Sequence, residues 1–173
     1  MIKTEREAVE TYALLDNGST KTIISKRLAD CISLNRVSRS TTLHTVEGVT
    51  RRQREIADFK VTSLEGDLEL EITQALISDF LTAGEDKPPT NAKVAHLDYM
   101  KGVSFKELAN TEIDLLLSVD HSWTWLGGEM RRSTSDKVMA LETRFGWALV
   151  GGSGAPEMES CMRTTVEVDN EEI

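Results

Sequence analysis

The sequence has no apolar run approaching the ~20 residues that a membrane-spanning helix needs, so we expect no transmembrane segment. Its charged first residues lack the apolar stretch of a secretion signal. Basic residues are also in deficit, because 20 Lys and Arg face 29 Asp and Glu and leave a net charge of -9. Binding to nucleic-acid phosphates requires a basic surface, which argues against a nucleic-acid partner.

Cysteine and histidine are both scarce. Cys31 is expected on a helix and Cys161 in a tail, far apart in sequence, so we predict reduced thiols in an intracellular, cytoplasmic protein and no structural disulfide. His44, His96 and His121 show no metal-ligand spacing with each other or with the cysteines, so no metal is expected. The sequence also lacks the Gly-x-Ser-x-Gly of a serine-hydrolase nucleophile turn.

What is present is enough apolar residue, 39% of 173 residues, to build the core of one domain. Alternation in segments such as residues 68–72 predicts strands with one buried and one solvated face. Further strands are predicted at residues 11–15, 22–25, 56–61, 74–77, 113–117, 138–143 and 147–150, a hairpin at 41–50, and short helices at 26–32 and 118–126. Short strands with one or two short helices predict an all-β fold, either closed or sandwich-like.

Composition also indicates how the chain is divided into segments. We expect an N-terminal extension over residues 1–10 and a domain over residues 11–152, in which residues 82–110 form an insertion or loop region. Residues 82–93 are expected to be a loop, and residues 96–110 a short strand and a helical turn. The acidic residues 153–173 are expected to form a flexible tail.

The most informative feature is Asp16-Asn17-Gly18. An apolar strand, residues 11–15, runs into this carboxylate, and the hydroxyl residues Ser19 and Thr20 follow the glycine turn. This order presents a carboxylate at the end of a buried strand, as aspartic peptidases do. Alternatively, Asn-Gly is simply a tight turn between two strands.

Four segments in order resemble retropepsin-like aspartic peptidases, most closely the peptidase domain of Pao/BEL-type retrotransposons. Residues 13–25 are similar to the catalytic loop and following strand, and residues 43–50 lie where the flap is expected. Residues 113–120, with Trp123 after them, resemble the apolar segment that crosses behind that loop. Residues 141–147 with Gly151 resemble the Thr-x-x-Gly-Trp signature of the Pao type. The resemblance spans roughly residues 12–152 and implies a retropepsin-like closed β-barrel or sandwich.

The resemblance also implies roles for individual residues. Asp16 would be catalytic, supported by Asn17, Gly18 and Ser118. Substrate would be bound by Ser19, Thr20, Val46, Glu47, Gly48 and Leu117. The chain holds one Asp-x-Gly triplet, so the second carboxylate must be Asp16 of another copy and the enzyme a homodimer.

The implied activity is that of an endopeptidase in which the paired Asp16 carboxylates activate a water molecule, with no metal or organic cofactor. Its polypeptide substrate would be a retroelement polyprotein, processed in the cytoplasm or in virus-like particles.

Two positions favour a different class of protein. Asn17 stands where the family usually has Thr or Ser, and Ser118 where glycine is usual. These differences fit a catalytically weak or inactive, retropepsin-derived module that dimerises or binds peptides. A third alternative is a monomer that dimerises only within a longer polyprotein, and for residues 46–48 an ordinary surface hairpin remains open.

Overall fold

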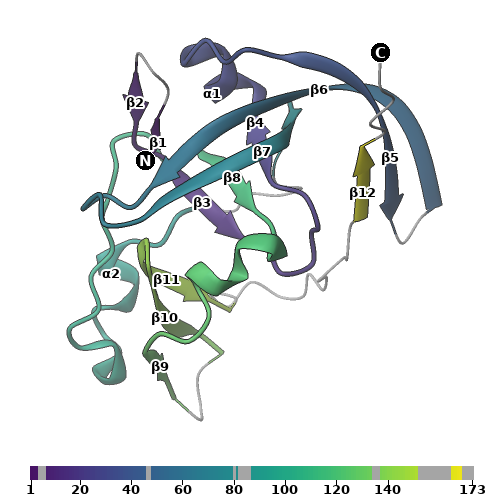
Figure 1. The fold of residues 1–173 in the computed structure, drawn as a ribbon. Helices are drawn as coiled ribbons and strands as arrows, with labels where there is room; N and C mark the ends of the chain where they lie inside the picture. The colour runs from purple at the N-terminus through teal and green to yellow at the C-terminus, as the bar shows by residue number, and fades with distance from the viewer. Residues whose placement is uncertain are drawn as a thin grey trace.

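The computed structural model describes residues 1–3, 7–45, 48–79, 81, 87–133, 137–151 and 165–168. These residues are mostly β-strand with a few short helices, which confirms the all-β class (Figure 1). The strands are β1 (Ile2–Lys3), β2 (Ala8–Val9), β3 (Tyr12–Leu15), β4 (Ile23–Ser25), β5 (Val37–Thr45), β6 (Gly48–Thr62), β7 (Glu69–Ser78), β8 (Ile113–Leu117), β9 (Met130–Arg132), β10 (Met139–Thr143), β11 (Gly146–Val150) and β12 (Thr165–Val168). The helices are α1 (Lys26–Cys31) and α2 (Asn91–Val94), with the 3-10 turns η1 (Asp98–Met100) and η2 (Val119–Thr124).

The main sheet has the strand order β12-β5-β6-β7-β4-β8-β3, and β1 joins it through β6. Although β3 and β4 are consecutive in sequence, β8 lies between them, parallel to β3 and antiparallel to β4. Leu15 is paired with Leu117, so β3 and β8 end at the same edge of the sheet. The connection from β3 to β4, residues 16–22, therefore crosses the end of β8.

A long hairpin, β5–β6, projects from the body of the domain (Figure 1). Its nine residue pairs run from Val37↔Ile56 to Thr45↔Gly48. The predicted hairpin at residues 41–50 is confirmed, but both strands are longer than expected. The mostly exposed basic run Arg51–Arg54 carries no apolar alternation, so sequence reasoning left it out of the strand.

The strands predicted separately at residues 68–72 and 74–77 are one strand, β7, so that division was wrong. A β-bulge interrupts its pairing with β6, because Ala57 faces Ala75 while Phe59 faces Ile72. Within the bulge Gln74 has a φ of 53°, and its N–H donates to Asp58 Oδ1 at 2.7 Å. One extra residue shifts the phase of the apolar alternation, which reads in the sequence as a strand end.

A second, smaller sheet has the order β11-β10-β9, and β9 was not predicted. Ala140 of this sheet packs with Val94, Met100 and Phe105 in a cluster separate from the main core. The described residues of segment 82–110, which was expected to be a loop or insertion, therefore pack against the smaller sheet. Residues 91–94 form α2 instead of a loop, and η1 is the regular element of residues 96–110.

The first residues of the chain and the described residues 165–168 join the main sheet. Ile2 of the expected extension is fully buried in the core, and the Met1 amino group donates to the Thr62 carbonyl at 2.9 Å. Residues 153–173 were expected to be a flexible tail, but their described part, β12, pairs with β5. The helices described are too short or too polar to cross a bilayer.

Candidate functional site

The Asp16 turn begins where β3 leaves the sheet. The Asp16 N–H still bonds the Leu117 carbonyl at 3.0 Å, so this residue is held against the end of β8. The Gly18 N–H donates to Asp16 Oδ1 at 2.8 Å, which is the geometry of an Asx-turn and fixes the carboxylate over its own turn. Asp16 is half-buried and Asn17 is exposed. The carboxylate is thus anchored from behind and retains access to solvent.

Ser118 lies directly behind the turn and is 1% exposed. Its hydroxyl is 3.2 Å from Thr22 Oγ1, and its N–H donates to the same oxygen at 3.3 Å. The serine that stands where the family usually has glycine therefore has a hydrogen-bond partner. Leu117, 1% exposed, packs in the main core.

Ser19 and Thr20 follow the turn. The Ser19 side chain is 2% exposed, and its hydroxyl donates to the Lys21 carbonyl at 2.9 Å. The Ser19 carbonyl accepts from the Val119 N–H at 3.0 Å. Ser19 therefore stabilises the loop through its hydroxyl and ties the loop to the start of η2 through its carbonyl. Thr20 is half-buried beside it.

The remaining predicted site residues belong to the hairpin. Val46 and Glu47 lie outside the described residues. Gly48 is exposed, begins β6 and has a φ of +141°, with open space where a Cβ would stand. The Thr45 hydroxyl donates to its carbonyl at 3.2 Å across the tip.

Sequence reasoning missed a buried charge near the start of β8, at the end of the strand opposite the Asp16 turn. Asp114, the second residue of β8, is 2% exposed. It accepts hydrogen bonds from Ser25 Oγ at 2.6 Å and from Thr11 Oγ1 at 3.1 Å. The Arg27 guanidinium forms an ion pair with it. A charge inside an apolar strand, Ile113-Asp-Leu-Leu-Leu, was the available signal, because buried carboxylates require partners.

Asp114 thereby links three segments of the chain at the start of β8. Thr11 precedes β3, Ser25 ends β4, and Arg27 belongs to α1. The Ser25 hydroxyl also accepts the Leu28 N–H at 3.0 Å, which caps α1 as its sequence predicts. Both strands that flank the Asp16 turn are therefore tied to β8 by the same carboxylate.

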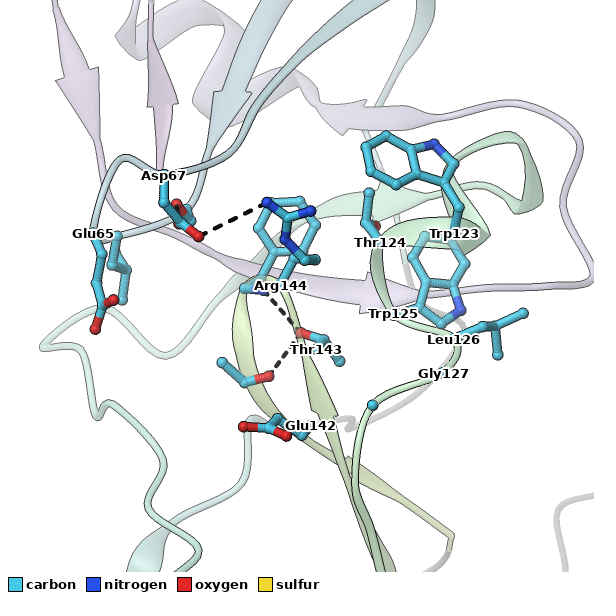
Figure 2. A pocket seen from close by; sticks show the side chains of 15 residues that line it. Glu65, Asp67, Trp123, Thr124, Trp125, Leu126, Gly127, Glu142, Thr143 and Arg144 are labelled. Carbon is cyan, nitrogen blue, oxygen red and sulfur yellow. Dashed lines mark hydrogen bonds and ion pairs between the residues drawn. The ribbon is translucent and has the colours of Figure 1, made fainter.

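A concave site of about 560 Å³ lies away from the Asp16 turn and includes none of the predicted site residues (Figure 2). Its walls are the β6–β7 turn, the chain after η2 and the β10–β11 turn, which belongs to the segment that resembles the Thr-x-x-Gly-Trp signature. Asp67 on one wall accepts from Ser63 Oγ at 2.5 Å, and this hydrogen bond lowers the pKa of the Asp67 carboxyl. Arg144 lies 3.8 Å from Asp67, and Trp123 is 56% exposed at the rim.

The described residues contain no group of three or more His, Cys, Asp or Glu side chains that could hold a metal ion. The exposed Cys31 is free, and Cys161 lies outside the described residues. Comparisons with protein-family models, with curated proteins and with solved structures give no significant match.

Proposed function

We propose that the chain is a retropepsin-type aspartic endopeptidase, active as a homodimer to which each copy contributes Asp16. The observation that carries the proposal is the placement of the Asp16 turn across the end of β8, with the Asp16 N–H bonded to the Leu117 carbonyl. This is the arrangement that the resemblance requires, since the apolar segment has to cross behind the catalytic loop. The mostly β architecture is compatible with the retropepsin-like closed barrel or sandwich.

The chemistry follows from pairing two such carboxylates. Like charges ~3 Å apart cannot both ionise cheaply, so one Asp16 would keep a proton while the other acts as a base. The base activates water, and the protonated partner polarises the scissile carbonyl. The Gly18–Asp16 hydrogen bond orients each carboxylate before substrate arrives. The substrate would be an extended polypeptide between the turn and the β5–β6 hairpin, with a retroelement polyprotein as the natural one.

A catalytically weak or inactive module that dimerises or binds peptides is the second candidate. Asn17 favours it, because an exposed amide takes the place of the hydroxyl that the family uses between copies.

Cleavage of a fluorogenic protein substrate at mildly acidic pH separates the two. We expect wild type to cleave, and Asp16→Asn to lose at least about 100-fold in rate, since it removes the proton-transferring group. Asp120→Asn is the matched control, because Asp120 is an exposed carboxylate on η2. Equal cleavage by Asp16→Asn and wild type would overturn the peptidase proposal. A dimer that never cleaves would favour the binding module.

A further inference from the structure

The strand β12 occupies the outer edge of β5. Four residue pairs join them in antiparallel register, from Thr165↔His44 to Val168↔Thr41. β12 is the end strand in the order of the main sheet, next to β5. Figure 1 draws it between the β5–β6 hairpin and the body of the domain. Without β12, the backbone groups of β5 that point away from β6 would form an open edge.

An open edge of this kind is a template for another extended chain, because its unpaired N–H and C=O groups accept an added strand. β12 holds the edge with a ladder of four pairs only. Because β12 is an edge strand held by so short a ladder, we expect it to open and to exchange with other extended strands.

Charge also fits an acidic occupant. Arg51 of β6 is paired with Thr42, which is paired in turn with Glu167. The three residues stand in one row across three strands. The sequence around β12 is acidic, Glu167 to Glu172, whereas the stretch of β6 on the other side of β5 is basic, Arg51 to Arg54. The edge is thus suited to an extended segment that combines β-branched and acidic residues.

We propose that the edge of β5 at residues 41–44 is a polypeptide-docking edge, which residues 165–168 occupy within the same chain. Docked in cis, this strand competes with extended polypeptide supplied in trans. Tethering gives such a segment an effective concentration in the millimolar range, so it masks the edge from weaker ligands. For its effect on cleavage the inference rests on the proposed function, because the β5–β6 hairpin is then the flap.

Hydrogen exchange on the full chain tests the cis contact directly. Val166→Pro/Glu167→Pro removes a backbone donor at two adjacent positions, one of which faces β5. We expect the amides of residues 41–44 that point away from β6 to lose at least about tenfold in protection. Amides bonded to β6 should keep theirs, as should all of them in the control Glu171→Pro/Glu172→Pro. Unchanged protection in the β12 variant would overturn the inference.

Binding in trans is measured by fluorescence anisotropy with a labelled peptide of residues 163–170. The β12 variant should bind it at least about tenfold more tightly than wild type or the control, because the competing strand is gone. Equal affinities would overturn the docking edge. If substrate is cleaved, the β12 variant should also show a lower KM. If no protein cleaves any substrate, the peptidase proposal fails, and exchange and anisotropy still decide the docking edge.

Discussion

Asp114 is the buried charge on which both strands flanking the Asp16 turn depend. Its carboxylate accepts from two hydroxyls, those of Ser25 and Thr11, and pairs with Arg27. Removing the charge leaves these donors without their acceptor, and buried donors are costly to leave unpaired. Asp114 therefore stabilises β3 and β4 at their ends remote from Asp16.

We expect Asp114→Asn to lower the free energy of unfolding by about 3 kcal/mol, since a buried, charge-assisted network loses its anion. Arg27 is half-exposed and can be solvated, which keeps the loss below that of a fully buried pair. Urea unfolding measures it. Glu112→Gln is the control, an exposed carboxylate two residues away that should change stability by less than about 0.5 kcal/mol. Equal stability of the two variants would contradict the role given to Asp114.

His121 provides a pH-dependent test of the turn after β8. Burial lowers the pKa of its imidazole, and the neighbouring Asp120 charge opposes this more weakly. The unfolded chain therefore takes up a proton more readily than the folded chain. This contribution to stability is complete above the unfolded pKa of about 6.5, and it is lost as pH falls through the lower pKa of the folded state.

The loss of stability between about pH 7.5 and pH 5 should accordingly be smaller in His121→Gln than in wild type. Urea midpoints at the two pH values measure the difference. His96→Gln, a change at an exposed histidine, should leave the wild-type difference unaltered. A His121→Gln variant with the full wild-type pH dependence would contradict the assignment.

Among the strands and helices, those with a strong local pattern were predictable. β8 has the expected bounds, and α1 is capped by Ser25 as expected. The division of β7 was wrong because a bulge breaks period-two alternation without ending the strand. β9 was missed because Met130-Arg-Arg132 has too few residues to show any alternation.

The backbone conformation of the bulge leads to a prediction about stability. Gln74 has a left-handed φ of 53°, which costs a non-glycine residue about 1 kcal/mol. Gln74→Gly relieves this strain, offset in part by the entropy of glycine in the unfolded chain, so we expect stability to rise by up to about 0.5 kcal/mol. Thr73→Gly, at the neighbouring exposed position, should instead lose about 1 kcal/mol. Thermal or urea unfolding compares them, and equal losses in both would contradict the strain.

Contacts between distant parts of the chain were the least predictable. No local pattern assigns Met1 and Ile2 to the edge of β6, or β12 to the edge of β5. The same holds for the candidate site. The Asp16 turn was found from its own sequence, whereas Thr22 and Asp114 were missed because their partners lie about 90 residues away or more. The turn can be predicted from its local sequence, whereas the contacts of Thr22 and Asp114 form only in the folded sheet.

The assembly decides whether this turn can act. One chain supplies one Asp16, and each carries a charge of -9, so two copies repel at long range. Salt screens this repulsion, with a Debye length of about 10 Å at 0.1 M, and should favour the pair.

Mixing wild type with Asp16→Asn tests the shared site. If subunits exchange at random, about a quarter of the dimers in an equimolar mixture carry two Asp16 carboxylates. Cleavage should then fall to about half that of the same amount of wild type alone. Mixing with Asp120→Asn should not lower it, because every dimer would retain both acids. Activity that is unaffected by Asp16→Asn would mean that each chain acts independently, and the two-fold site would be excluded.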